Sequence, residues 1–265
     1  MTAGTSATAH IFATAGLRPE RSIASPPSTC ARLLVWIGLV GVLSGPPAHA
    51  EADGSVSGNH AYIPEFDAYV KLTDRARVFL LADATRSTPQ DTTDGEVGIH
   101  LDYTLEPFLR SSLRDADWER ERYVWIRVGY RRQWNIEGRP AQPAENRVVL
   151  ELTARSELPR QVWLVNRLHI DFRDIAGAWS NRYRYRIGVE KEFATANGTA
   201  FVPYARAEFY YDTRYDAWSR QVYQVGVDID LSKSWRIEPY VALQKNIQPT
   251  TDTVNQLGLV LKYYR

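Results

Sequence analysis

Two His-x-Asp pairs have residue types and a spacing that could support acid–base chemistry. They are His100-Leu-Asp102 and His169-Ile-Asp171. On a β-strand this spacing places both side chains of a pair on one face. The carboxylate could then orient the imidazole as the general base of a serine hydrolase, for example one that acts on lipids. No serine stands out as a partner, so we expect no catalytic residue and interpret both histidines as members of a polar network.

The sequence does not indicate sites for metals, cofactors or nucleic acids. Two distant histidine pairs without a tight histidine cluster do not make a metal site, and the chain lacks a glycine-rich phosphate loop. Lys and Arg total 32, and Asp and Glu total 31, which gives a formal charge of +1. A nearly neutral chain has no general attraction for nucleic acid. We therefore expect no metal, no cofactor and no nucleic-acid partner.

An alternation of polar and apolar residues defines the elements that would carry these side chains. From Trp179 to Phe193, arginines and glutamates occupy one face, and Tyr, Ile, Val and Phe occupy the other. This period of two predicts β-strands. Similar segments bring the number of expected strands to eleven, at residues 62–72, 76–83, 95–105, 122–134, 146–158, 161–173, 179–193, 200–212, 218–230, 235–246 and 254–264. Residues 107–121 break the rhythm and could form a short amphipathic helix or another strand.

The first fifty residues differ from the rest and predict a secretory signal peptide. Arginines precede the uncharged apolar run Leu33–Leu43, and the triplet Ala48-His-Ala50 follows it. A transmembrane helix is the weaker alternative, since eleven apolar residues span about half of a bilayer core. We expect cleavage near Ala50, with a signal peptide at 1–50 and a barrel domain at 51–265. Cys30 precedes the apolar run, which argues against a lipoprotein.

Strand length and face polarity favour a membrane barrel over a soluble one. Most predicted strands have 10–15 residues, whereas strands in soluble sheets usually have about five or six. One face is apolar, as at Leu257, Leu259 and Leu261, the other is charged, and aromatic residues lie near segment ends. These are the features of an outer band, interfacial girdles and a polar lumen. We predict an all-β, transmembrane up-and-down antiparallel β-barrel; a soluble antiparallel sandwich would show the same alternation.

The last strand carries a pattern of residues that resembles a known assembly signal. Its members are Gln256, Gly258, Leu261 and Tyr263. They resemble the C-terminal signal of bacterial outer-membrane proteins, which implies recognition by the barrel-assembly machinery and contact with outer-membrane lipids. One departure is that the chain ends in Tyr264-Arg265 instead of on an aromatic residue. The expected location is the outer membrane of a Gram-negative bacterium.

The chain also resembles the barrel family called domain of unknown function 2490. The resemblance is carried by Glu65–Leu72 with Arg77-Val-Phe79, by the run Arg182–Arg186, and by Val202–Tyr211. It extends over nearly the whole of the expected mature chain. Its motifs are structural, so the resemblance implies a fold and a location and supplies no activity.

The number of strands does not follow directly from the segments. If the last strand runs into the periplasm, as the resemblance to outer-membrane proteins implies, eleven strands would make the first one begin outside the cell. An even number removes this conflict. We therefore expect twelve strands, with the additional one near 106–115 or 51–61, or ten if one pair is misread.

The polar face of the strands predicts the lining of the lumen. By alternation, the inward residues are Arg127, Arg131, Arg147, Glu151, Arg155, Arg167, His169, Asp171, Arg173, Arg182, Arg184, Arg186, Glu190, Glu192, Arg206, Glu208, Arg220, Asp228, Arg236 and Glu238. Arginines outnumber carboxylates by 12 to 7 in this set. Inward charges need partners or water. They could form an ion-pair network that stiffens a structural barrel, or a narrow, porin-like channel that attracts small anionic solutes. A third reading is a closed receptor or scaffold that binds a partner through loops such as Asp212–Trp218.

Overall fold

The computed structural model describes residues 59–88, 91–105, 123–137, 143–194 and 200–265. The expected signal peptide at 1–50, its cleavage site and the segment 107–121 lie outside these residues. The strands are β1 (Asn59–Lys71), β2 (Ala76–Thr88), β3 (Thr92–Thr104), β4 (Val124–Asn135), β5 (Glu145–Leu158), β6 (Val162–Ile175), β7 (Ala178–Lys191), β8 (Phe193–Ala194), β9 (Ala200–Asp212), β10 (Ala217–Asp230), β11 (Trp235–Asn246) and β12 (Asp252–Tyr264). A short 3₁₀ turn, η2 (Pro159–Gln161), joins β5 to β6. In the described part of the chain, no helix is long and apolar enough to cross a membrane.

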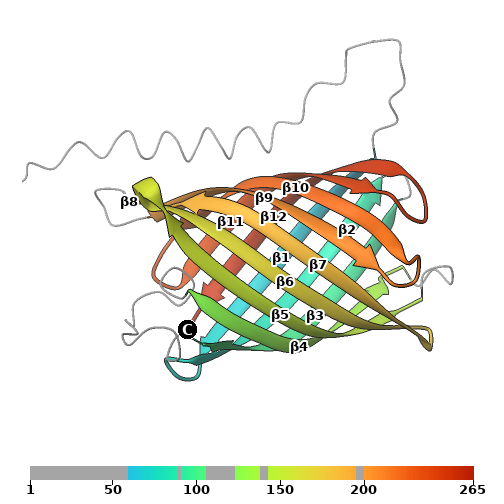
Figure 1. Cartoon of the computed structure of the whole chain (residues 1–265), viewed down its shortest axis with the longest axis horizontal. Coiled ribbons are helices and arrows are strands. Elements are labelled where there is room, and N and C mark those ends of the chain that lie inside the picture. Colours follow the sequence, from blue (N-terminus) through green and yellow to red (C-terminus); the bar gives the residue numbers. More distant parts are fainter. Residues whose placement is uncertain (1–58, 89–90, 106–122, 138–142, 195–199) are drawn as a thin grey trace, which may run out of the picture. The chain divides into compact units, whose positions relative to one another are not determined.

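The long strands form one closed barrel (Figure 1). From β1 to β7, each strand pairs in antiparallel fashion with the next strand along the chain. The pairing then continues from β7 to β9 and on through β10 and β11 to β12. The two-residue β8 only extends the edge beside β9. Closure is different, because β1 and β12 pair in parallel, with Asn59 beside Val254 and Tyr69 beside Tyr264. The predicted all-β barrel is confirmed, and every predicted strand segment has its counterpart.

The expectation of twelve strands was wrong. The described barrel closes with eleven long strands. β3 pairs directly with β4 and β1 directly with β12, so no further strand lies between the members of either pair. Residues 59–61 belong to β1, and 51–58 and 106–115 lie outside the described residues. The parity argument failed because it assumed that the first strand begins at the end of the barrel where the last strand finishes; with β1 parallel to β12, the two lie at opposite ends. The connector expected at 84–94 was also too long, since β2 continues to Thr88 and β3 begins at Thr92.

The barrel has two distinct ends. The Asn59 end holds the start of β1 and the ends of β2, β4, β6, β9 and β11. The Arg265 end holds the end of β12 and the turns that follow β1, β5 and β10. An odd number of strands therefore places the start of β1 and the end of β12 at opposite ends of the barrel.

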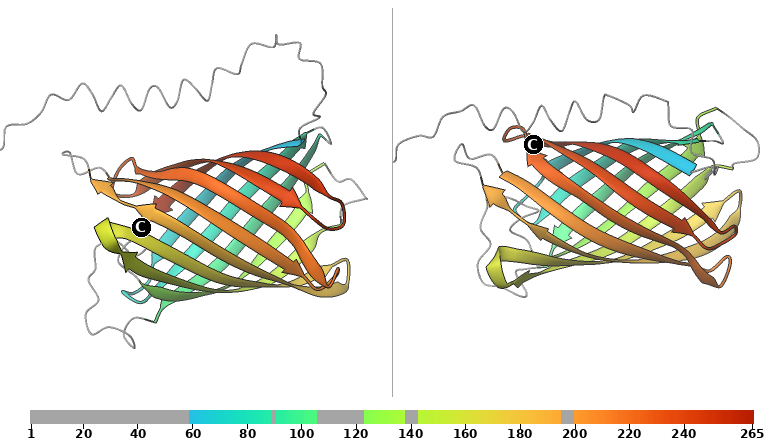
Figure 2. Two further views of the ribbon diagram at one scale, coloured as in Figure 1. Left: turned by 45° about the horizontal axis from the view of Figure 1, so that its top comes forward. Right: turned by 90° about the horizontal axis from the view of Figure 1, so that it is seen from above.

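The strands are strongly inclined to the barrel axis (Figure 2). From Phe66, the pairing can be followed strand by strand in either direction around the ring. Through β2 to β6 it reaches Trp179, and through β12 to β9 it reaches Phe193. One full circuit of the barrel therefore shifts the register by 14 residues (193 − 179), which is the shear of the barrel. For an eleven-stranded barrel this offset corresponds to a tilt of roughly 40–45°, in the usual range for closed barrels.

The two faces of the barrel wall differ in polarity. Large apolar side chains point outward and are exposed, including Ile99 (56% exposed), Leu168 (54%) and Val225 (52%). Charged side chains point inward and are buried; Asp102, Asp171 and Asp212 have no exposed area. The apolar residues are therefore on the outside and the charges on the inside, the reverse of a small soluble barrel.

Candidate functional site

The interior of the barrel holds a cavity of about 750 Å³. All eleven long strands contribute to its lining. Asn59 and Asp252 line it at the Asn59 end, and Arg155 and Glu192 line it toward the Arg265 end. The cavity thus extends along the barrel and is surrounded mainly by polar and charged side chains.

The residues expected in the lumen point into the barrel. Those that line the cavity are Arg127, Arg131, Arg147, Glu151, Arg155, Arg167, His169, Arg182, Arg184, Arg186, Glu190, Glu192, Arg206, Glu208, Arg220, Asp228, Arg236 and Glu238. Asp171 and Arg173 do not line it; they are buried in the inner layer, with 0% and 2% exposure. The alternation of the sequence locates these side chains because each strand keeps a regular pleat along this stretch.

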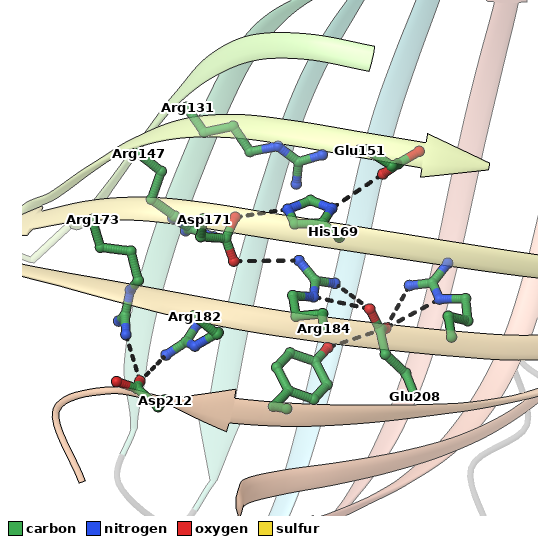
Figure 3. A network of polar contacts seen from close by, with 12 residues as sticks. Arg131, Arg147, Glu151, His169, Asp171, Arg173, Arg182, Arg184, Glu208 and Asp212 are labelled. Carbon is green, nitrogen blue, oxygen red and sulfur yellow. Dashed lines mark hydrogen bonds and ion pairs between the residues drawn. The ribbon is translucent and has the colours of Figure 1, made fainter. Parts of the chain in front are cut away.

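His169 lies between two carboxylates (Figure 3). Its Nδ1 is 3.1 Å from Glu151 Oε2, and its Nε2 is 2.7 Å from Asp171 Oδ1. Each ring nitrogen therefore has one carboxylate oxygen as its partner. The same network continues to Arg184, whose Nη1 is 3.8 Å from Asp171 Oδ2 and whose Nη2 is 2.8 Å from Glu208 Oε1. Strands β5, β6, β7 and β9 are joined in this way through their inner faces.

Asp212 contacts three guanidinium groups near the Asn59 end, and two of them, those of Arg173 and Arg182, are seen in Figure 3. Its Oδ2 lies 2.6 Å from Arg173 Nη1, 3.3 Å from Arg182 Nη2 and 3.1 Å from Arg214 Nη2. Arg173 also donates two hydrogen bonds to Glu145, at 2.5 and 2.6 Å. One buried carboxylate therefore serves cations from β6, β7 and the β9–β10 turn.

A second network fills the other side of the barrel. Asp102 accepts hydrogen bonds from Arg77 Nε at 2.9 Å and from Arg127 Nε at 2.6 Å. Arg127 also lies over the ring of Phe79, with its Cζ 4.0 Å from the ring centroid. Glu96 pairs with Arg131 Nη1 at 3.1 Å and with Arg147 Nη2 at 2.5 Å. Carboxylates of β3 are thus neutralised by arginines of β2, β4 and β5.

Several inward carboxylates were missed by the sequence reasoning. They are Glu65, Asp67, Asp83, Asp94, Glu96, Glu145, Asp212, Asp230 and Asp252. Among the described residues that line the cavity, 13 are Arg or Lys and 12 are Asp or Glu. The excess of arginine inferred from the sequence therefore disappears once β1 to β3 are included. The signal that could have found Glu65 and Asp67 is the same alternation that found the arginines.

The two His-x-Asp pairs differ in the structure. His169 contacts its partner Asp171, whereas His100 Nε2 accepts a hydrogen bond from Arg131 Nε at 2.9 Å and Asp102 is bound by arginines. Within the described ranges, no serine hydroxyl forms a hydrogen bond with either histidine. The same residues contain no group of three His, Cys, Asp or Glu side chains able to hold a metal ion.

The residues of the expected assembly signal lie along β12. Gln256 points inward and donates a hydrogen bond to Gln244 at 2.9 Å. Gly258 lies against the ring of Tyr240, so closely that an added Cβ would be 2.0 Å from Tyr240 Cζ. Leu261 points outward with 37% exposure, and Tyr263 packs against Trp235 with ring centroids 4.9 Å apart.

Comparison with known proteins identifies a family for this chain. No curated protein matches the sequence. Among solved structures, the chain is similar to the beta domain of the Bordetella autotransporter BrkA, with 15% identity and a TM-score of 0.43. That similarity covers 71% of this chain and 83% of the other. A family match spans residues 115–255, which includes the run Arg182–Arg186 and Val202–Tyr211. This is more than half of the 265 residues, and the chain belongs to the family described as protein of unknown function (DUF2490).

Proposed function

We propose that this chain is an integral outer-membrane β-barrel of a Gram-negative bacterium, exported with cleavage of a signal peptide near Ala50. The exposed apolar band supports this location, since apolar side chains facing lipid need no partner. Closure also supports it, because every long strand is paired on both edges, as lipid requires. Exposed aromatic residues near strand ends, such as Trp179 (75% exposed) and Trp218 (55%), suit a membrane interface.

The proposed role is a narrow passive channel for small charged solutes. The observation that carries this proposal is the charge-lined cavity of about 750 Å³, which reaches from Asn59 and Asp252 to Arg155 and Glu192. Inward charges in a narrow, low-dielectric tube act strongly on passing ions. We propose a modest preference for anions, drawn by the arginines of β6, β7 and β9. The carboxylates of β1 to β3 limit that preference.

A second candidate is a closed structural barrel or receptor. The dense polar contacts favour it, because Glu208 and Asp212 each contact at least two arginines and Glu151 contacts Arg167 and His169. Such a network could fill the lumen and leave no continuous path for ions. The proposal assigns no enzymatic activity and no cofactor to either form.

Single-channel recording distinguishes the two candidates. The protein would be purified from the outer membranes of expressing cells, and its folding checked by a heat-dependent shift in gel mobility. Discrete conductance steps in a planar bilayer, with a reversal potential that favours chloride in a KCl gradient, are the expected result. A protein that shifts on the gel and inserts but stays silent would overturn the channel and favour the closed barrel.

A further inference from the structure

Glu65 and Arg186 lie at the same height on opposite walls of the barrel. β1 and β7 are separated by six strand steps in one direction around the ring and five in the other, so they face each other. Followed through β2 to β6, the pairing path from Phe66 ends at Trp179, near the Asn59 end of β7. Followed through β12 to β9, it ends at Phe193, near the Arg265 end. The level point on β7 is therefore about halfway between them, at Arg186. Glu65 is the neighbour of Phe66 in β1, and both Glu65 and Arg186 line the cavity.

The wall formed by β1 and β2 is acidic at this height. Glu65 is the direct cross-strand partner of Asp83, and Asp67 follows on the same face of β1. None of these three carboxylates forms an ion pair with a described residue. Asp67 is 5% exposed; its Oδ2 accepts a hydrogen bond from Tyr69 at 3.1 Å, and its Oδ1 is buried with no hydrogen-bond partner in the described structure.

The facing wall is basic. Arg167, Arg186 and Arg206 from β6, β7 and β9 line the same cavity. Their carboxylates are shared, since Glu208 contacts both Arg184 and Arg186, and Glu151 contacts both Arg167 and His169. Carboxyl groups without a cationic partner on one wall thus face guanidinium groups that share their partners on the other.

We propose that the middle of this lumen selects zwitterionic solutes that carry an ammonium group at one end and a carboxylate at the other. The ammonium group contacts Glu65 and Asp83, and the carboxylate contacts Arg186 with Arg167 or Arg206. This assignment rests on the proposed channel and specifies its class of solute.

The physical reason is the direction of the field across the lumen. A solute with one charge is attracted by one wall and repelled by the other, so it gains little at the middle of the channel. A dipolar solute aligned across the lumen is attracted at both ends. Two contacts of the strength usual for partly solvated ion pairs together give roughly a fivefold or larger gain in affinity.

The test is block of the KCl current by molecules of matched length. The blockers are ω-amino acids from glycine to 8-aminooctanoate, compared with the corresponding carboxylates and alkylammonium ions, at pH 8.5 where the probe ammonium groups stay protonated. We expect one ω-amino acid length to block best, at a concentration about fivefold below those of both singly charged analogues. Equal block by zwitterion and analogues at every length would overturn the assignment, and a silent channel would instead overturn the proposed function.

Variants locate the contact. Glu65→Gln combined with Asp83→Asn removes two carboxylates that make no ion pair, so the barrel should still fold and show its heat-dependent gel shift. We expect the advantage of the zwitterion over the carboxylate to disappear in this double variant. The matched control is Glu192→Gln, which removes a carboxylate from the same cavity near the Arg265 end. The control should retain the advantage. Loss in both variants, or in neither, would contradict a site at Glu65.

Discussion

Arg173 of β6 and Asp212 of β9 are joined across the strand that separates them. Arg173 Nη1 lies 2.6 Å from Asp212 Oδ2, with side-chain exposures of 3% and 0%. β7 runs between their strands, so the contact ties second neighbours in the wall together. Because Arg182 of β7 also reaches Asp212 at 3.3 Å, one carboxylate holds three consecutive strands at the Asn59 end.

Asp212→Asn should destabilise the barrel by about 3 kcal/mol, the usual cost of leaving buried charges without their partner. The substitution keeps the shape of the side chain and leaves Arg173, Arg182 and Arg214 with less compensation. The free energy of unfolding would be measured by urea denaturation of the folded protein in detergent or lipid.

The matched control is Asp216→Asn in the same turn. Asp216 is exposed and has a φ of 49°, a conformation that Asn accepts readily, so this change should cost less than about 0.5 kcal/mol. Equal losses in the two variants would show that the cation cluster at Asp212 does not stabilise the barrel.

The sequence was sufficient to locate the strand segments, but it did not predict how the first and last strands pair to close the barrel. Alternation identifies a strand whichever neighbour it pairs with, since it reports only the inner and outer faces. The direction in which β1 pairs with β12 is set by backbone hydrogen bonds. These bonds can form with any type of side chain, so the alternation carries no information about the direction. Nothing in the residues around Asn59 or Val254 indicates this direction.

The acidic wall was missed for a related reason. The end of β2, from Ala84 to Thr88, contains small and polar residues on both faces and reads as a loop. Asp94 was therefore placed in a connector and Asp83 at the last position of a predicted strand, although Asp83 pairs with Glu65 on one side and Glu96 on the other. Only the register shows that these carboxylates face the arginines of β7.

Two valines on β10 provide a test of the inner and outer faces. Val225 points outward with 52% exposure, whereas Val222 lines the cavity beside Glu208. Val225→Arg should reduce the amount of folded protein in the outer membrane, because Arg on the lipid face costs about 2–4 kcal/mol near the midplane. Val222→Arg should be tolerated better, with Glu208 and water to contact. The readout is the fraction of protein with the gel mobility of the folded form, and a reversed order would mean that the faces are assigned incorrectly.

The glycine of the assembly pattern has a packing role that a double variant can isolate. A Cβ at position 258 would lie 2.0 Å from Tyr240 Cζ, so Gly258→Ala should force that ring to move and lower the yield of folded barrel. Gly258→Ala combined with Tyr240→Ala should recover part of this loss, because the coupling between contacting residues is not additive. If the double variant is no better than the sum of the single variants, the glycine acts in recognition by the assembly machinery and not in packing against Tyr240.

Parallel closure predicts a specific disulfide. Phe66 on β1 and Leu261 on β12 are register partners and both point outward, with exposures of 41% and 37%. Neighbouring strands bring Cα atoms within the separation that a disulfide spans. Residues 51–265 contain no cysteine, so Phe66→Cys with Leu261→Cys should cross-link under mild oxidation. Phe66→Cys with Leu257→Cys, displaced by four residues, should not. After proteolysis in a loop between the two strands, the disulfide would keep the N-terminal and C-terminal fragments together on a non-reducing gel. Cross-linking of the displaced pair, or of neither pair, would contradict the eleven-stranded register.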